Sequence, residues 1–111
     1  MTDITTSGFA VWNGDDSGWE AIDEACVLHD ADRPEPVVGR GAIRARVAEY
    51  RAAVPDLRVE PAESIAEGDL VATRWTATSG GTVVLRGISL GRTRDGRLVE
   101  SWIVPAGGDG A

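Results

Sequence analysis

The sequence contains a single histidine, His29, and an aspartate, Asp30, follows it directly. An imidazole titrates near neutral pH, so His29 could take a proton from an acidic carbon or give one to a developing alkoxide. Asp30 could be a second carboxylate of the same pocket, or could hold another group in place. Both also have a structural interpretation: His29 could bond to backbone at a strand end, and Asp30 could form an Asx turn with Asp32. From the residue types alone, a structural role is favoured over a catalytic one for both residues. His29 and Asp30 are nevertheless our candidate catalytic residues.

Tryptophan is frequent, with four residues against one phenylalanine and one tyrosine. An indole has a large apolar surface and one hydrogen-bond donor, which suits a core as well as a pocket for an aromatic ligand. Our candidates for contact with such a ligand are Trp12, Tyr50, Trp75, Ser89 and Trp102. Trp75 is the best of them, because its strand is expected to cross the middle of a sheet. Ser89, like Ser101, could place a hydroxyl on a cavity wall, whereas Trp19 and Tyr50 also fit core positions on helices.

The remaining polar residues favour structure over chemistry. Glu100 and Arg74 fall in predicted strands, where a cross-strand ion pair on the outer face or at a dimer contact would explain both. Cys26 is the only cysteine, so it cannot form an internal disulfide. One cysteine and one histidine give no zinc-type ligand spacing. We therefore expect neither a metal nor another cofactor.

The charge of the chain narrows its possible partners. The formal net charge is −7, and the eleven basic residues, all arginine, are scattered along the sequence. Binding to nucleic acid requires a basic face, so nucleic acid is not an expected partner. The N-terminal segment lacks the features of a secretory signal, and no segment has the length of a membrane span. These features favour a cytoplasmic protein that does not bind a membrane.

The first half of the chain is predicted to be mainly helical. Apolar residues recur at helical spacing over residues 9–12 and 19–25, around a break at Asn13–Asp16. A short apolar run, Cys26–His29, predicts a buried strand, and the prolines of residues 33–36 predict an extended loop. The clearest helix covers Gly39–Ala53. Its apolar face contains Ile43, Val47, Tyr50 and Val54, and the side chains expected to turn mostly to water are Arg44, Arg46, Glu49 and Arg51.

The second half of the chain is predicted to be a sheet, because the hydrophobic period changes to two from Leu57 onward. Turns at residues 67–69, 79–81 and 95–96 separate strands over residues 70–78, 82–93 and 98–104. Helices followed by an antiparallel meander indicate an α+β fold with the helices packed on one face of the sheet. We expect one domain over residues 1–111, in which residues 106–111 form a Gly-rich tail.

Five segments in this order resemble proteins of the SnoaL-like polyketide cyclase family, within the NTF2-like superfamily. The segments are FAVWNGDD, VLHD, VVGRGAIRARVAEYRAAVPDLRVE, IAEGDLVATRWTAT and RGISLGRTRDGRLVESW. The resemblance covers about residues 9–102. It implies a cone in which N-terminal helices pack against a curved, mainly antiparallel sheet around a pocket for a small apolar or aromatic molecule. It also implies a homodimer formed through the outer face of the sheet.

The resemblance changes the weight given to His29, which matches the family's VxHD position, where the imidazole tends to face the cavity. Two departures from the family pattern concern the same pocket. Only Ser79–Gly81 joins two strands between which the family has a longer loop with a recurrent histidine. The acid that the cyclases place three residues after the last tryptophan is replaced by Pro105, and Asp109 lies too far along the tail to substitute for it.

Two functions remain open at this point. The first is a cofactor-independent cyclase or isomerase of secondary metabolism, which positions a polyketide-like intermediate and uses His29 as acid and base. The second is a ligand-binding or accessory dimer without catalysis on the same scaffold. Two other activities of the superfamily are disfavoured. Limonene-type epoxide hydrolysis needs an aspartate where Thr76 stands, two residues after Arg74, and ketosteroid isomerisation needs an acid inside the last strands.

Overall fold

The computed structural model describes residues 4–31 and 33–106. Helix α1 (Ile4–Trp12) comes first and ends at a turn over Asn13 and Gly14. A 3-10 helix, η1 (Asp16–Ala21), follows, and the carboxylate of Asp15 caps it by accepting a hydrogen bond from the backbone N–H of Ser17 at 3.0 Å. Strand β1 (Ile22–Asp30) then begins directly. The predicted break is therefore confirmed, and two helical segments precede the first strand.

The predicted helical character of residues 22–25 is wrong, because these residues belong to β1. Ile22 and Cys26 are buried while the residues between them are not, a spacing that also fits a helix. The cause is an irregularity in the strand: the pairing of β1 with β6 shifts register between Ile22 and Val27. Buried and less buried residues alternate regularly only after this shift. The hydrophobic pattern therefore predicted only the second half of β1 as a strand.

Helix α2 (Arg40–Ala53) starts one residue later than predicted. Gly39 precedes it with φ of 96°, a conformation that a residue with a side chain rarely adopts. Ile43 and Val47 are buried on the apolar face of the helix, as their spacing predicts. A short strand, β2 (Val37–Val38), lies between β1 and α2 and was not predicted.

Four long strands complete the chain, and their boundaries lie within one residue of the predictions where these were made. They are β3 (Leu57–Glu67), β4 (Leu70–Ser79), β5 (Thr82–Arg94) and β6 (Arg97–Pro105). Their three hairpins all close through two-residue turns, and two of these turns are Gly80–Gly81 and Asp95–Gly96. All four residues of these two turns have positive φ, which suits the right-handed twist of the strands.

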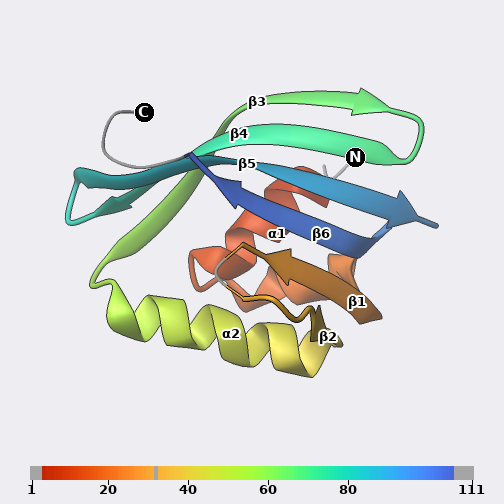
Figure 1. Ribbon diagram of the computed structural model, residues 1–111, viewed down its shortest axis with the longest axis horizontal. Helices are drawn as coiled ribbons and strands as arrows, with labels where there is room; N and C mark the ends of the chain where they lie inside the picture. Colours follow the sequence, from red (N-terminus) through yellow and green to blue (C-terminus); the bar gives the residue numbers. More distant parts are fainter. Residues whose placement is uncertain (1–3, 32, 107–111) are drawn as a thin grey trace.

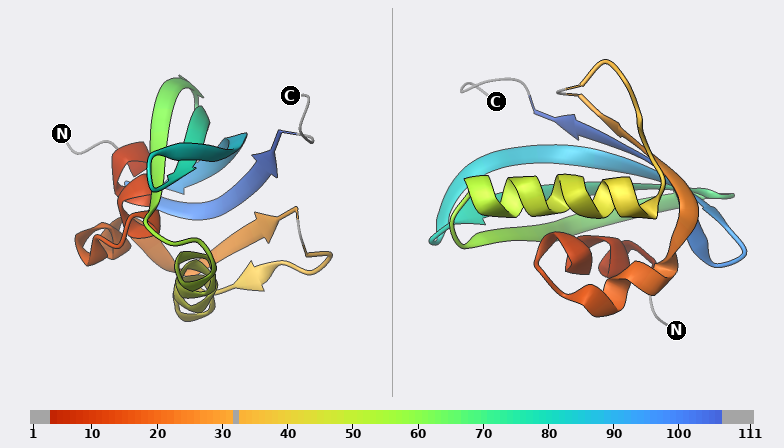
Figure 2. Two further views of the ribbon diagram at one scale, coloured as in Figure 1. Left: turned by 90° about the vertical axis from the view of Figure 1, so that its left-hand side faces the viewer. Right: turned by 90° about the horizontal axis from the view of Figure 1, so that it is seen from below.

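The six strands form one sheet in the order β2-β1-β6-β5-β4-β3. All neighbouring strands are antiparallel except β1 and β6, which run parallel. The sheet is curved, and α1, η1 and α2 all lie on its concave side (Figures 1 and 2). This is the predicted α+β arrangement, with helices packed on one face of a mainly antiparallel sheet.

Buried apolar residues form two clusters between the helices and the sheet. The larger cluster joins α1, η1, α2, β1 and β2 and contains Val11, Trp19, Ile22, Cys26, Leu28, Val37, Ile43 and Val47. The smaller one lies on β3 and β4 and contains Leu57, Val59, Trp75 and Ala77. Trp12 and Ile103 pack against both clusters. Among the described residues, no helix is long and apolar enough to span a membrane.

Candidate active site

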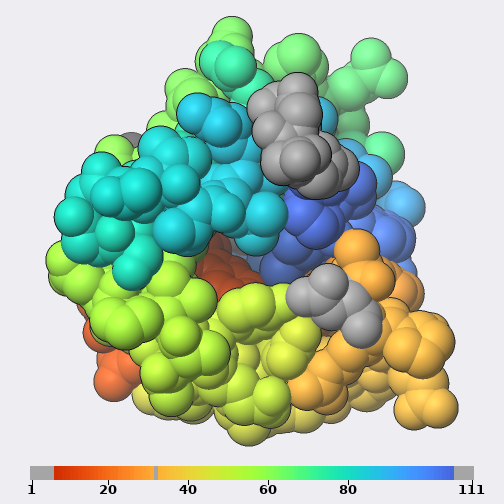
Figure 3. Space-filling model, turned by 60° about the vertical axis from the view of Figure 1, so that its left-hand side comes forward, coloured from red at the N-terminus to blue at the C-terminus, as the bar shows by residue number. Residues whose placement is uncertain are grey.

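A cavity of about 340 Å³, which we call the wide cavity, lies between α1, α2 and the sheet. The helices contribute Phe9, Trp12, Tyr50 and Val54 to its wall, and the strands contribute Asp30, Leu57, Val59, Trp75, Ala77, Val84, Leu85, Ser89, Ile103 and Pro105. In Figure 3 the molecule is hollowed between α2 and β5, with α1 visible at the bottom of the hollow. Its volume is at the lower end of the range for ligand pockets, which starts at about 300 Å³. The wall is predominantly apolar, so this cavity suits a small apolar or aromatic molecule.

Asp30 is the only carboxylate among the described residues that line the wide cavity. Its side chain is 3% exposed, and Arg46 of α2 binds its Oδ2 atom through Nε at 2.9 Å and Nη2 at 2.8 Å. The hydroxyl of Tyr50 accepts a hydrogen bond from Arg46 Nη2 at 3.0 Å and donates one to the same Oδ2 atom at 3.2 Å. We call Asp30, Arg46 and Tyr50 the polar cluster. A buried carboxylate is tolerated only when it is paired, and the polar cluster supplies that pairing.

Arg46 is the residue of the polar cluster that the sequence did not reveal. It was expected to turn mostly to water, but its side chain is only 13% exposed. Its guanidinium also lies over the ring of Tyr50, 4.3 Å from the ring centre. The available signal was its spacing, because residues 46 and 50 are neighbours on a helix surface. Once Tyr50 is assigned to the inner face of α2, Arg46 lies close enough to reach the same pocket.

The ionisation of two buried groups follows from these surroundings. Burial by itself lowers the pKa of Arg46, but the hydrogen bond to Asp30 and the nearby charges outweigh it, so the pKa lies above its ordinary value. Arg46 therefore remains a cation at any physiological pH. Burial raises the pKa of the Cys26 thiol to about 11, helped by the charges of Asp23 and Glu100. Cys26 is accordingly a neutral thiol and a poor nucleophile at neutral pH.

Four of the five predicted ligand-contacting residues line the wide cavity: Trp12, Tyr50, Trp75 and Ser89. The rings of Trp12 and Tyr50 meet edge to face with their centres 5.5 Å apart. The Trp75 side chain packs on β5 at Gly87, where any Cβ atom would collide with the indole. The Nε1 atom of Trp75 is buried and has no hydrogen-bond partner within the described part of the chain. Such an unsatisfied buried donor is uncommon and marks this wall of the cavity as a functional candidate.

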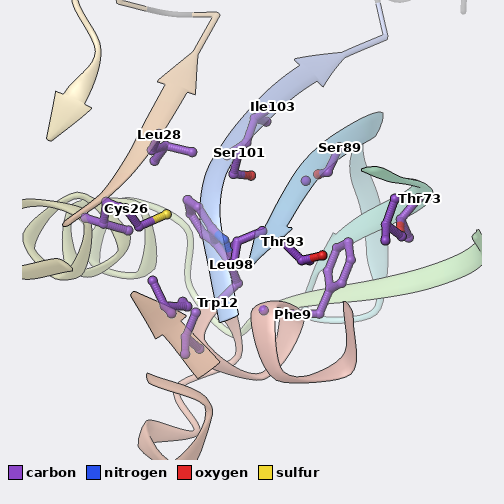
Figure 4. Close-up of a pocket in the computed structure, with 16 residues that line it drawn as sticks. Phe9, Trp12, Cys26, Leu28, Thr73, Ser89, Thr93, Leu98, Ser101 and Ile103 are labelled. Carbon is purple, nitrogen blue, oxygen red and sulfur yellow. The ribbon is translucent and has the colours of Figure 1, made fainter. Parts of the chain in front are cut away.

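A second, smaller cavity adjoins the first, and we call it the narrow cavity. Its volume is about 90 Å³, and it shares Phe9, Trp12, Ser89 and Ile103 with the wide cavity. Figure 4 shows side chains from α1 and strands β1, β4, β5 and β6 converging on it, including the hydroxyl-bearing Thr73, Ser89, Thr93 and Ser101. The hollow between helices and sheet therefore has a broad part and a constricted part.

His29 and Trp102 do not line either cavity. Their rings stack on one another with centres 5.1 Å apart, and His29 Nε2 lies 2.7 Å from Glu100 Oε2. Because side chains alternate along a strand, Leu28 and Asp30 face the interior and His29 faces the opposite side. The expectation that His29 points into the cavity is therefore wrong. Trp102 lies outside both cavities as well, so nothing in the structure supports its predicted contact with a ligand. The family position of His29 is matched, but its neighbour Asp30 is the residue in the cavity.

The other sequence expectations concern metals and ion pairs. No group of three or more potential metal ligands occurs among residues 4–31 and 33–106. Arg74 pairs with Glu63 of β3 rather than with Glu100, whose partners are His29 and, at 3.6 Å, Arg92. Arg74 and Glu100 therefore do not pair with one another, but each forms a cross-strand ion pair with a residue of a neighbouring strand, as expected for polar residues in a sheet. The proposed Asx turn involves Asp32, which lies outside the described residues.

Comparison with known proteins identifies the family. The model of the SnoaL-like domain matches residues 8–101, which is most of the chain. The protein belongs to the SnoaL-like family. A comparison with curated protein sequences gave no significant match.

Solved structures of SnoaL-like and NTF2-like proteins share the fold. IdmH from Streptomyces antibioticus, described as a candidate polyketide cyclase, is 26% identical with a TM-score of 0.77, and the alignment covers 93% of this chain and 89% of IdmH. A candidate SnoaL-like isomerase from Agrobacterium tumefaciens is 20% identical with a TM-score of 0.82, covering 94% and 95% of the chains. An NTF2-like protein from Cytophaga hutchinsonii is 9% identical with a TM-score of 0.74, covering 94% and 88%. The fold is therefore NTF2-like.

Two positions at which the sequence departs from the pattern implied by the resemblance bear on the wide cavity. Pro105, at the position where the resemblance implies an acid, lines the cavity. The position is thus at the pocket, but its side chain cannot exchange a proton. The short Gly80–Gly81 turn leaves Val84 and Leu85 at the same wall, both about half exposed. Asp30 is consequently the acidic group that the described part of the cavity offers for chemistry.

Proposed function

We propose that this SnoaL-like protein is a cofactor-independent cyclase or isomerase that acts on a small, polyketide-like molecule in the wide cavity. The observation that carries the proposal is one paired carboxylate, Asp30, in the wall of an otherwise apolar cavity. An apolar wall orients a flat ligand by its shape, and holding two reacting carbons together supplies a large part of the barrier reduction. The similarity to IdmH, at 26% identity, supports the same class of reaction.

The reaction that fits these groups is an intramolecular aldol-type ring closure. Asp30 takes a proton from a carbon next to a carbonyl, and the electron pair of the broken C–H bond becomes an enolate. The enolate carbon attacks a second carbonyl carbon of the same molecule, which forms the new C–C bond and leaves an alkoxide. The alkoxide takes the proton back from Asp30, either directly or through the Tyr50 hydroxyl, which donates to Asp30. Arg46 is a positioning residue that balances the charge of the buried carboxylate.

Proton abstraction can be tested without the natural substrate. The probe is 2-tetralone, an apolar bicyclic ketone, whose α-hydrogens exchange with deuterium from solvent. We expect the protein to accelerate this exchange, and Asp30→Asn to lower the acceleration by about 100-fold or more, the typical contribution of a positioned acid/base group. Tyr50→Phe should have a smaller effect. Mass spectrometry measures deuterium incorporation, and circular dichroism checks the fold of each variant.

His29→Gln is the matched control, because this residue lies next to Asp30 but outside both cavities. Its exchange rate should equal that of the wild type. If His29→Gln abolishes exchange while Asp30→Asn retains it, the assignment of Asp30 is wrong. Because Asp30→Asn leaves the charge of Arg46 without its partner, the double variant Asp30→Asn, Arg46→Gln provides a second test in which both charges are removed.

A second function is favoured by a specific observation, the apolar Pro105 at the acid position of the cavity wall. It is a ligand-binding or accessory protein that performs no reaction. Both functions predict that the wide cavity binds aromatic molecules, but only the enzyme accelerates exchange. Calorimetric binding of 2-tetralone with exchange no faster than in buffer would favour the binding protein.

A further inference from the structure

The narrow cavity is much smaller than the wide cavity. Its volume is about 90 Å³, against about 340 Å³ for the wide cavity. It lies closer to the β5–β6 turn than the wide cavity does, because Thr93 and Leu98 in its wall pair with one another beside that turn. The two cavities share Phe9, Trp12, Ser89 and Ile103, so a molecule in the wide cavity can extend a short substituent past these side chains.

Two hydroxyls in the narrow cavity are available to such a substituent. Four residues bring hydroxyls to its wall, but Thr73 bonds to Ser64 at 2.9 Å and Thr93 to the Asp69 carbonyl at 3.4 Å. Ser89 and Ser101 have no side-chain hydrogen bond to any described residue. In Figure 4 their hydroxyls point towards the same region, on the cavity side of β5 and β6. Because a hydroxyl donates and accepts, the two serines can both donate to one acceptor atom.

The rest of the narrow cavity is uncharged. Its described lining contains no aspartate, glutamate or arginine, and Leu28, Ile43 and Leu98 form apolar parts of the wall. Gly91 lies directly opposite Ser101 in the pairing of β5 with β6, and the absence of a side chain there keeps the space beside the serine open. A neutral group with one hydrogen-bond acceptor and a small alkyl part matches these walls. A ketone or short acyl end has this chemistry.

We propose that the narrow cavity binds a short carbonyl-bearing end of the ligand whose ring system occupies the wide cavity. The hydroxyls of Ser89 and Ser101 donate to the carbonyl oxygen, and the apolar wall encloses the alkyl part. This inference rests on the proposed function, because it assumes a ligand in the wide cavity. Its consequence is orientation: fixing one end of the molecule determines which carbon lies beside Asp30.

The test compares naphthalene, 2-acetylnaphthalene and 2-isopropylnaphthalene by calorimetry on the full chain. The last two have nearly the same shape, but only the acetyl compound has a carbonyl oxygen. We expect the wild type to bind the acetyl compound about fivefold more tightly than the isopropyl compound, the effect of one or two net hydrogen bonds. The double variant Ser89→Ala, Ser101→Ala should bind the two compounds equally, with unchanged affinity for naphthalene.

A second variant, Gly91→Ala, tests whether the volume of the narrow cavity matters for binding, independently of the two hydroxyls. A Cβ atom at position 91 would lie 2.9 Å from Leu98 Cδ1 inside the narrow cavity, so Gly91→Ala reduces its volume. We expect Gly91→Ala to weaken both substituted compounds by about tenfold through overpacking, and to leave naphthalene unaffected. The matched control is Thr76→Ala, which removes a hydroxyl on β4 from a residue that lines neither cavity. Its affinities should equal those of the wild type.

Two results would overturn the inference, and they differ in what they say of the proposed function. If the wild type binds all three compounds with equal affinity and Gly91→Ala changes none of them, the narrow cavity takes no part in binding while the wide cavity remains a ligand site. If the wild type binds none of the compounds, naphthalene included, the inference fails together with the proposed ligand site.

Discussion

The carboxylate of Asp30 is almost completely shielded from solvent. Its side chain is 3% exposed and that of Arg46 is 13% exposed, so each ion depends on the other for the stabilisation that solvent would otherwise give. Removing one partner leaves a buried charge uncompensated, whereas removing both leaves only a change of shape. The residues of the polar cluster that are candidates for catalysis are therefore also expected to affect the stability of the folded protein.

This dependence gives a prediction for three variants. Asp30→Ala should lower the free energy of unfolding by about 3–5 kcal/mol, because it leaves the buried Arg46 guanidinium without a countercharge. The double variant Asp30→Ala, Arg46→Met should recover a large part of that loss, although it lacks the ion pair. Urea denaturation followed by tryptophan fluorescence measures the difference. If the single and double variants lose equal amounts of stability, the unpaired charge of Arg46 is not the cause of the loss.

Cys26 gives a prediction about pH. Its pKa in the folded protein is about 11 against an ordinary value of 9.0, because the folded state buries the thiol. Between these values the unfolded chain loses the thiol proton and the folded chain keeps it, so the contribution is present below pH 9 and is lost as the pH rises towards 11. We expect the wild type to lose roughly 2 kcal/mol more stability than Cys26→Ala between pH 8 and pH 10.5. Urea denaturation at pH 8 and pH 10.5 tests this, and parallel curves for the two proteins would contradict it.

At the scale of single residues, the sequence named several residues that line the wide cavity, but it did not show which of His29 and Asp30 faces that cavity. Trp12, Tyr50, Trp75, Ser89 and Asp30 were all named as candidates, and all line the wide cavity. His29 was preferred over Asp30 because it matches the family's VxHD position. Strand alternation allows only one of two neighbours to face inward. Which one does so depends on packing against α2, which no local pattern reveals. Arg46 was missed although its spacing from Tyr50 on the helix was a usable signal.

The elements themselves were predicted closely where their patterns are local. The limits of α2 and of the last three strands follow from turn residues and periodicity, which are properties of a few consecutive residues. The parallel pairing of β1 with β6 could not be predicted in this way, because it joins residues far apart in the chain. It is this pairing that places Asp30 of β1 beside Ile103 of β6 and so closes the wall of the wide cavity.

One contact between elements depends on a single side chain. Asn13, after the end of α1, donates from its amide to the Val59 carbonyl at 2.9 Å and accepts from the Val59 N–H at 2.7 Å. Strand β3 is an edge of the sheet, and Asn13 bonds to it as a neighbouring strand would. Val59 also lines the wide cavity, so this contact fixes the distance between α1 and one cavity wall.

We expect Asn13→Ala to destabilise the protein by about 1–3 kcal/mol, because it leaves the half-buried polar groups of Val59 without partners. Asn13→Asp is the matched variant, since it retains an acceptor for the Val59 N–H but cannot donate to the carbonyl. It should lose less stability than Asn13→Ala at neutral pH. Hydrogen exchange at the Val59 amide measures the contact directly, and unchanged protection in Asn13→Ala would contradict this assignment.

The whole molecule has two faces of different character. The concave face of the sheet packs on the helices and contains both cavities, while the convex face is open. On that open face Ile65, Ile88 and Val104 are 76%, 52% and 56% exposed. Strand pairing places Ile88 opposite Val104 and the half-buried Leu90 opposite Trp102, whereas Ala72 of β4 lies between Ile65 and Leu90. Contiguous exposed apolar residues on a sheet favour association with another protein surface.

We therefore expect a homodimer formed through the convex face, as the resemblance to the family implied. Ile88→Lys should raise the dimer dissociation constant by at least about tenfold, because it places a charge at the centre of an apolar contact. Val38→Lys is the matched control, since Val38 is 63% exposed but lies on β2, at the far edge of the sheet. Sedimentation equilibrium measures the association. A wild type that is monomeric at high micromolar concentration would contradict the expectation. Because the cavities lie on the concave face, Ile88→Lys should retain the ligand affinity of the wild type even as a monomer, and this separates the role of association from the role of the cavities.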